Sequence, residues 1–187
     1  MSFRKKNDSD AYKRSVFSNL NKVKRLIWNL AWLIFCSWTP APLHFWRVFV
    51  LRIFGAKIGN SNFIYPDCII WAPWNLFTED VVTIGPGVEI YNPTKVKLAH
   101  HSIISQDAYL CGATHDYNSI DFTYIKKEIT IEPYVWICAQ AIVLPGVTCQ
   151  EGSVLGAGSI TSKDLESWSV YAGNPSKFIK KRNNFLL

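Results

Sequence analysis

The sequence predicts an all-β fold, a parallel β-helix, with a helical segment at its N-terminus. Three observations support this prediction: aliphatic residues recur every six positions, glycines stand at fixed places in that period, and the period runs through most of the chain. Neither the period of two of a strand nor the 3.6-residue period of an α-helix produces a repeat of six. A short strand followed by a corner does, and three such sides close a coil of about 18 residues.

The first predicted element is a basic, Trp-rich helical segment in residues 1–45. Apolar residues recur at helical spacing from Val16 to Ile34, and Pro40 and Pro42 follow them. Because proline cannot continue a helix, we expect the helix to end before this pair.

The positive charge of the chain is concentrated in the same segment. Residues 1–25 hold eight basic and two acidic side chains, which accounts for the whole net charge of +6. The apolar run in residues 26–38 is shorter than the roughly 18–20 residues that span a bilayer. Two interpretations stay open: the helix packs on the β-helix or on a neighbouring subunit, or residues 1–38 lie on an anionic membrane. Nucleic-acid binding is not expected, because the aromatic residues belong to an apolar helix and not to a stacking groove.

The second predicted unit, residues 46–187, is the β-helix itself. Its hexads fall into runs that are separated by register shifts, and stacked coils would bury the repeating positions as one continuous column. These positions are Ile58, Ile64, Ile70, Leu76 and Val82, then Ile84, Ile90 and Val96, then Leu98, Ile104 and Leu110, and finally Ile131, Ile137, Val143, Cys149 and Leu155. Glycines such as Gly146 suit the corners, where φ can be positive.

The repeat is interrupted in residues 111–128, which we predict to be an active-site loop. A loop that leaves a regular solenoid adds nothing to the buried column and is usually functional. It contains His115, and histidine can accept a proton from a hydroxyl group near neutral pH. Asp116, another carboxylate or a carbonyl group could orient the imidazole.

The five cysteines favour a reducing compartment. Their number is odd, and no CxxC pair or secretory signal occurs. We therefore expect a cytoplasmic protein, with the inner face of the cytoplasmic membrane as a site of peripheral contact.

Several segments of the chain resemble one enzyme family. They are WRVFVLRIFGAKIG, PWNL, EIYN, SIISQDAYLCGATHDY, VWICAQAIVLPGV and AGNPSKFIK, and they lie within roughly residues 45–182. In this combination the chain resembles the hexapeptide-repeat acetyltransferases of colanic acid and exopolysaccharide biosynthesis, which are relatives of the nodulation-factor and galactoside acetyltransferases. The resemblance implies a left-handed β-helix, a homotrimer, acetyl-CoA as acyl donor and no metal. It also implies a sugar or lipid-linked glycan as acceptor in surface polysaccharide biosynthesis.

The resemblance assigns catalytic and acceptor residues. It implies that His115 is the general base, beside Asp116, and that Asn92 lies near the acceptor. Trp136 either lines the acceptor or pantetheine channel or fills a packing role.

The same resemblance assigns an acetyl-CoA groove between adjacent subunits. The matching residues are Ala139, Ala157, Gly158, Ser162, Lys163, Lys180 and Arg182. Lys180 or Arg182 would meet the 3′-phosphate, since anionic oxygens need positive partners. Cys138 is either a small packing residue or a thiol near the sulfur of coenzyme A.

Two other functions compete with the transferase as interpretations of the sequence. A γ-type carbonic anhydrase needs three histidines that converge on zinc, whereas His100 and His101 are adjacent in the sequence and no histidine follows His115. A non-enzymatic trimeric scaffold would leave the interruption at residues 111–128 without a purpose. The sequence does not predict which sugar or which hydroxyl group accepts the acyl group.

Overall fold

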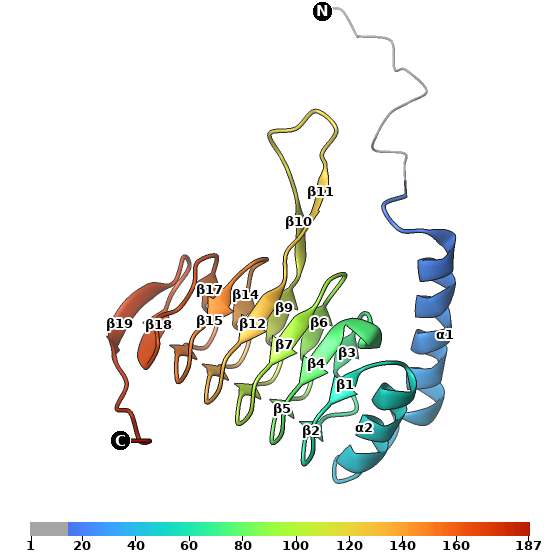
Figure 1. The fold of residues 1–187 in the computed structure, drawn as a ribbon, viewed down its shortest axis with the longest axis horizontal. Helices are drawn as coiled ribbons and strands as arrows, with labels where there is room; N and C mark the ends of the chain where they lie inside the picture. The colour runs from blue at the N-terminus through green and yellow to red at the C-terminus, as the bar shows by residue number, and fades with distance from the viewer. Residues whose placement is uncertain (1–14) are drawn as a thin grey trace, which may run out of the picture.

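The computed structural model describes residues 15–187 and confirms the parallel β-helix with an N-terminal helical segment (Figure 1). Short strands wind into a solenoid of three parallel sheets, with the helices at one end and a hairpin projecting from one side. The basic residues Arg4, Lys5, Lys6, Lys13 and Arg14 lie outside the described residues.

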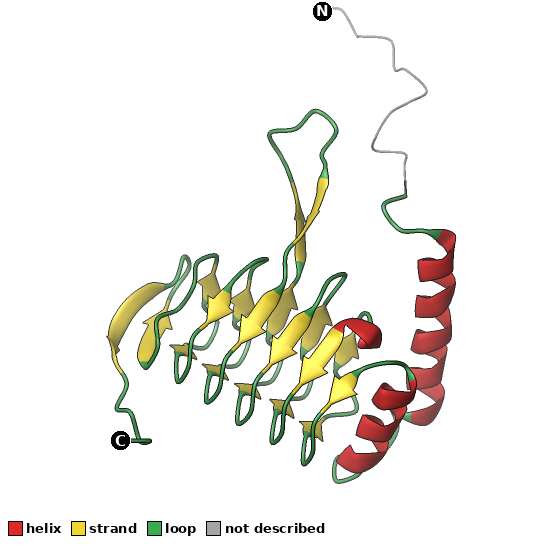
Figure 2. Cartoon of the chain, viewed as in Figure 1, coloured by secondary structure: helices red, strands yellow, loops and turns green. Residues whose placement is uncertain are grey.

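Each coil contributes one strand to each of three sheets (Figure 2). Sheet A contains β1 (Lys57–Ile58), β4 (Leu76–Thr78), β7 (Val96–Leu98), β12 (Ile129–Ile131) and β15 (Thr148–Cys149). Sheet B contains β2 (Phe63–Ile64), β5 (Thr83–Ile84), β8 (Ile103–Ile104), β13 (Trp136–Ile137), β16 (Val154–Leu155), β18 (Ser169–Ala172) and β19 (Lys177–Lys181). Sheet C contains β3 (Ile69–Ile70), β6 (Glu89–Tyr91), β9 (Tyr109–Cys111), β14 (Ile142–Val143) and β17 (Ile160–Thr161). All neighbouring strands in these sheets are parallel except β18 and β19.

The column of repeating aliphatic residues forms the core. Every hexad position that the sequence predicted to point inward is buried, from Ile58 in the first coil to Leu155 near the end. Cys149 occupies such a position and is completely buried, so it packs as a small apolar residue.

The coils differ in length. In the first coils the paired residues are 20 apart, as in Phe63 and Thr83, whereas in the coil after the hairpin they are 18 apart, as in Trp136 and Val154. The two additional residues explain the register shifts in the sequence. Inward-facing Ile70 and Thr78 are eight positions apart, so the additional residues lie at the corner between sheets C and A, where η2 (Pro73–Asn75) turns the chain.

Helix α1 (Asn19–Phe35) packs across the end of the solenoid (Figure 1). Ser18 caps its first turn by accepting a hydrogen bond from the amide of Asn21 at 3.2 Å. On the inner face Trp28 is buried and donates its indole N–H to the carbonyl of Ile70 at 2.6 Å. These contacts fix the helix to the first coil.

A second helix, α2 (His44–Ile53), lies inside the region expected to be β-helix, so the boundary predicted at residue 46 is too early. The solenoid starts only at Lys57. Arg47 of α2 is completely buried and donates from its guanidinium group to the carbonyl oxygens of Ile64, Pro40 and Ala41. A buried charge that is fully hydrogen-bonded ties the helix to the solenoid, because these donors would otherwise lose their water.

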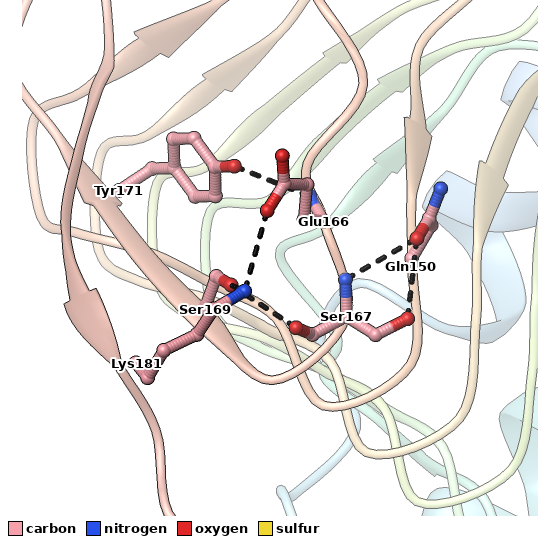
Figure 3. Close-up of polar contacts among 6 residues, drawn as sticks. All are labelled: Gln150, Glu166, Ser167, Ser169, Tyr171 and Lys181. Carbon is pink, nitrogen blue, oxygen red and sulfur yellow. Dashed lines mark hydrogen bonds and ion pairs between the residues drawn. The ribbon is translucent and has the colours of Figure 1, made fainter.

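A polar network holds the C-terminal strands together (Figure 3). Lys181 contacts Glu166 at 3.3 Å and Ser169 at 2.9 Å, and Ser167 donates twice to the side-chain oxygen of Gln150. The contacts of Lys181 help to hold β19, the strand that carries Lys180, beside β18, and those of Ser167 connect the preceding turn to Gln150.

Candidate active site

The hairpin corner, as we call the corner between sheets C and A, is where the chain departs from the solenoid. In the third coil it leaves after β9 and returns at β12. The interruption predicted as a loop in residues 111–128 contains two antiparallel strands, β10 (Ala113–His115) and β11 (Tyr124–Lys126). They form a hairpin that projects from the solenoid (Figure 1).

His115 is the last residue of β10 and pairs with Tyr124 across the hairpin. Its Nδ1 atom lies 2.8 Å from the carbonyl oxygen of Phe122, and its ring stacks on the Phe122 ring with centroids 4.4 Å apart. A carbonyl oxygen only accepts hydrogen bonds, so Nδ1 must carry a proton. In the neutral imidazole Nε2 therefore keeps its lone pair, which is the state that a general base requires.

Asp116 does not orient the imidazole in this chain. Its carboxylate accepts a hydrogen bond from the amide of Asn118 at 3.0 Å, and its own amide donates to the carbonyl of Thr123 at 2.8 Å. Asp116 thus shapes the hairpin turn. The carbonyl of Phe122 takes the orienting role, one of the alternatives that the sequence left open.

Tyr124 connects the hairpin to the solenoid. Its hydroxyl group lies 2.8 Å from the hydroxyl group of Tyr91, at the end of β6. Burial raises the pKa of Tyr124, and its hydrogen bond to Tyr91 adds to the effect. Tyr124 therefore stays protonated at neutral pH and fastens the base of the hairpin beside His115, a role that the sequence did not reveal.

Asn92 lies beneath the hairpin and not on the surface of the site. It is completely buried, its Oδ1 atom accepts from the amide of Ala72, and its Nδ2 atom donates to the carbonyl of Ala72, both at 2.8 Å. Asn92 therefore supports the hairpin corner in this chain, and its place near the acceptor stays a prediction.

Trp136 lies on the outer face of sheet B, where it is 45% exposed and donates from its indole to the hydroxyl group of Ser105 at 2.8 Å. Sheet B is the side of the triangular coil opposite the hairpin corner. Within one chain, Trp136 and His115 therefore lie on different sides of the solenoid.

Three of the predicted acetyl-CoA residues gather at the corner between sheets B and C. Gly158 follows Ala157 and donates its amide to the carbonyl of Ala139, one coil away, at 2.9 Å. Gly158 has a φ of +65°, and a Cβ atom added there would meet nothing within 4 Å. The position is therefore open, and it favours glycine because of its left-handed backbone and not because of crowding.

The remaining predicted acetyl-CoA residues are distributed over other parts of the solenoid. Ser162 and Lys163 are exposed after β17, and Lys180 is exposed on β19. Arg182 instead donates from Nη1 to the carbonyl oxygens of Tyr134 and Gly152 at 3.0 and 2.9 Å. The structure thus gives Arg182 the task of anchoring the C-terminal tail, which leaves Lys180 as the exposed cation of the pair.

The structure bears on two alternatives, a reactive thiol at Cys138 and a zinc site built from histidines. Cys138 is buried, and burial raises the pKa of its thiol, which disfavours the reactive thiolate. Within residues 15–187, no three His, Cys, Asp or Glu side chains are grouped so that they could hold a metal ion. His100 and His101 contact each other, whereas His115 lies out on the hairpin.

The fold and this site define an acyltransferase of the hexapeptide-repeat class, with a histidine on a segment that projects from one corner of the solenoid and small residues at another corner. No family model matches the sequence. The chain is 37% identical over 166 residues to the colanic acid biosynthesis acetyltransferase WcaF of Escherichia coli (strain K12). The matched region covers 89% of this chain and 91% of that protein. The chain belongs to the colanic acid biosynthesis acetyltransferase family.

Solved structures of lower sequence identity have the same fold. A hexapeptide-repeat acetyltransferase from Vibrio cholerae matches with a TM-score of 0.80 and 20% identity over 89% of this chain and 95% of that one. A galactoside acetyltransferase in complex with coenzyme A matches with a TM-score of 0.77 and 22% identity over 90% of this chain and 86% of that one. The hexapeptide-repeat architecture therefore extends over most of the chain.

Proposed function

We propose that this chain transfers the acetyl group of acetyl-CoA to a sugar hydroxyl group on an intermediate of surface polysaccharide biosynthesis. The observation that carries the proposal is the hydrogen bond from His115 to the carbonyl of Phe122, because it leaves Nε2 free to accept a proton. The family relative named for colanic acid biosynthesis supports the substrate class, and the fold relative bound to coenzyme A supports the donor.

In the proposed reaction, Nε2 of His115 removes the proton of the acceptor hydroxyl group as its oxygen attacks the thioester carbonyl. The carbon–sulfur bond then breaks, and the imidazolium returns the proton to the departing coenzyme A thiolate. The thioester supplies a good leaving group, so the step calls for no protein nucleophile. Asp116, which shapes the turn, takes no proton in this scheme.

The direct test is transfer to a natural acceptor. Purified protein is incubated with isotope-labelled acetyl-CoA and glycan intermediates from the producing organism, and the products are analysed by mass spectrometry. We expect one added acetyl group per acceptor and loss of the product with His115→Ala. If neither the wild-type protein nor the His115→Ala variant gives labelled glycan, but the wild-type protein binds partner proteins through its solenoid, the non-enzymatic scaffold becomes the better explanation.

We further propose a homotrimer with active sites between subunits. The exposed Trp136 and the corner around Ala157 lie on different sides of the coil from His115, so one chain alone offers only separate parts of a site. A second copy would bring these parts together. Light scattering should give about three times the 21.3 kDa chain mass, and a monomer that transfers acetyl groups would contradict the proposal.

The outer face of α1 supports a proposal of contact with an anionic membrane at the cytoplasmic face. Among residues 15–187, no helix is long and apolar enough to cross a bilayer. The outward side of α1 and α2 nevertheless consists of exposed apolar residues: Leu20, Val23, Leu26, Ile27, Leu30, Leu33, Ile34, Phe45, Phe49 and Ile53. This face lies at the end of the solenoid (Figure 1), where subunits packed side by side would leave it open, and the basic residues of positions 1–24 complement anionic lipid.

The membrane proposal is tested with the full chain and anionic vesicles. A double substitution on the outer face, Leu30→Glu with Leu33→Glu, should abolish cosedimentation with phosphatidylglycerol vesicles. Ile179→Glu, an equally exposed position on β19, should not. Binding should weaken as salt is added, since screening shortens the reach of the basic residues. Equal binding of the two variants would refute the proposal.

A further inference from the structure

The segment that opens α1 lies against the catalytic hairpin. Phe17, just before the helix, contacts Tyr124 with ring centroids 5.5 Å apart and Trp71 with centroids 4.9 Å apart. Tyr124 in turn lies 5.2 Å from the His115 ring. A helix that the sequence treats as a separate element thus reaches the catalytic base through two ring contacts.

Trp71 and Tyr91 continue this surface along the hairpin corner. They follow β3 and end β6 one coil apart, and their rings meet edge to face at 5.4 Å. We call the set of Phe17, Trp71, Tyr91 and Tyr124 the aromatic patch. All of its side chains are half-buried, so each leaves some surface exposed, and Tyr124 connects the patch to His115. Aromatic rings offer apolar faces to a sugar, and tyrosine hydroxyl groups add hydrogen-bonding atoms.

Arg25 places a positive charge on the patch. Its guanidinium carbon lies 4.3 Å from the centroid of Trp71 and 5.2 Å from that of Phe17, and its Nε atom donates to Asn21 at 3.1 Å. These contacts hold the group in a fixed orientation. Among residues 15–187, its two terminal nitrogens have no hydrogen-bond or ion-pair partner. Their donors are therefore free for an anionic ligand.

Arg25, the aromatic patch and His115 follow one another in an order that matches the phosphate, the sugar ring and the hydroxyl groups of a phosphorylated sugar. A guanidinium group presents parallel donors that match phosphate oxygens. Next to it lies the aromatic patch, and beyond the patch lies the histidine that would remove a hydroxyl proton. A sugar that is carried on a phosphate or diphosphate would present the anion at one end and its hydroxyl groups at the other.

We propose that Arg25 and the aromatic patch form the acceptor subsite for a glycosyl phosphate or diphosphate, with the phosphoryl group on Arg25 and the sugar directed toward His115. This inference rests on the proposed acetyl transfer to a sugar and specifies the acceptor. The phosphoryl group of a nucleotide-linked sugar and that of a lipid-linked sugar offer the same chemistry to Arg25, so the test includes both.

Binding is measured by isothermal titration calorimetry on the full chain, without acetyl-CoA, so that the result does not depend on catalysis. The probes are UDP-glucose, farnesyl diphosphate and free glucose. We expect one or both phosphorylated probes to bind and free glucose not to bind. Arg25→Gln should weaken that binding about tenfold or more, the usual effect of losing a charge-assisted hydrogen bond, while Arg25→Lys should retain part of it.

Two controls separate a specific subsite from general electrostatics. Lys177→Gln removes the same charge from an exposed position on β19 and should leave probe binding unchanged. Binding of Arg25→Gln to phosphatidylglycerol vesicles should equal that of the wild type, because Arg25 faces the solenoid and not the outer face of α1. Thermal unfolding verifies that each variant is folded.

The proposal fails if no phosphorylated probe binds, or if Arg25→Gln and Lys177→Gln weaken binding equally. It also fails if Arg25→Gln loses vesicle binding but keeps probe binding, since Arg25 would then serve the lipid headgroups. Failure of acetyl transfer is a separate result: His115→Ala should bind the phosphorylated probe as the wild type does. Arg25-dependent binding without any transfer would therefore overturn the proposed reaction and leave the anion subsite standing.

Discussion

The imidazole of His115 receives its orientation from a main-chain oxygen, that of Phe122. A carbonyl oxygen is always an acceptor and does not titrate, so it selects the tautomer with a free Nε2 atom at any pH at which the imidazole is neutral. A carboxylate in the same place could be protonated or replaced by mutation. The reactive tautomer therefore depends on the hairpin backbone and not on a second side chain.

His115→Ala should lower kcat for transfer to a true acceptor by roughly 10²–10⁴-fold, the usual contribution of a general base. The residue lies outside the aliphatic column, so thermal unfolding and subunit assembly should change little. Steady-state kinetics with labelled acetyl-CoA measure the effect. A variant that keeps more than about a tenth of the wild-type rate would remove His115 from the role of base.

Asp116→Asn should behave very differently. The asparagine side chain keeps an oxygen that can accept the hydrogen bond from the amide of Asn118, so the turn should persist. We expect kcat to stay close to the wild-type value in the same transfer assay. A loss comparable to that of His115→Ala would mean that the charge of Asp116 acts in catalysis and that the carbonyl of Phe122 is not sufficient.

The hairpin, at the scale of elements, owes its position to contacts with its neighbours. Its own two strands pair over only three residues each, and so short a hairpin is marginal by itself. The hydroxyl pair of Tyr91 and Tyr124 and the ring contact with Phe17 connect it to the solenoid and to α1. The positioning of His115 is thus shared among the hairpin, the solenoid and the segment that opens α1.

A double-mutant cycle on Tyr91 and Tyr124 tests this connection. Each change to Phe removes one hydroxyl group, and the loss of one hydrogen bond is worth about 1 kcal/mol, which corresponds to roughly a fivefold fall in kcat. The double variant should lose no more than either single one, because both changes break the same bond. The KM for acetyl-CoA should not change. Additive losses would show that the two hydroxyl groups act independently.

Sequence reasoning identified the elements that repeat and missed those that do not. The six-residue spacing of the aliphatic residues indicates which of them are buried, so the column from Ile58 to Leu155 was predictable. Helix α2 was not predictable because its exposed side carries apolar residues such as Phe45 and Phe49, so the sequence lacks the polar face of an ordinary surface helix. The hairpin strands were not predictable because they are short and lack the hexad phase. The burial of Asn92 depends on the neighbouring coil, which a single sequence does not display.

The buried thiols influence stability at the scale of the whole molecule. Burial raises the pKa of Cys36 to about 11, and it raises the pKa values of Cys68 and Cys149 as well. For Cys149, nearby Asp164 and Glu132 add to the effect. A thiol with a higher pKa in the folded chain holds its proton more tightly there than in the unfolded chain. Its contribution to stability is therefore complete below the ordinary thiol pKa of about 8.5 and is lost progressively above it.

Thermal unfolding midpoints should accordingly be nearly level from pH 7 to about pH 8 and fall at higher pH. Cys149→Val is the informative variant, because valine fills the same hexad position at Val143 and does not ionise. In this variant the unfolding midpoint should fall less at alkaline pH than it does in the wild type. Identical pH profiles for the two proteins would show that Cys149 does not contribute to it.

The change in coil length has a consequence for how such an enzyme can diversify. Two additional residues and an entire hairpin are accommodated at one corner, while Lys97 and Thr130 still pair in register across the long hairpin insertion. Inserted sequence at that corner leaves the stacking of the strands intact. A lineage can therefore exchange the hairpin that carries His115 while the corner around Ala157 and Gly158 is inherited unchanged. In this fold, sequence inserted at the hairpin corner can vary without disturbing the strands that stack in the solenoid.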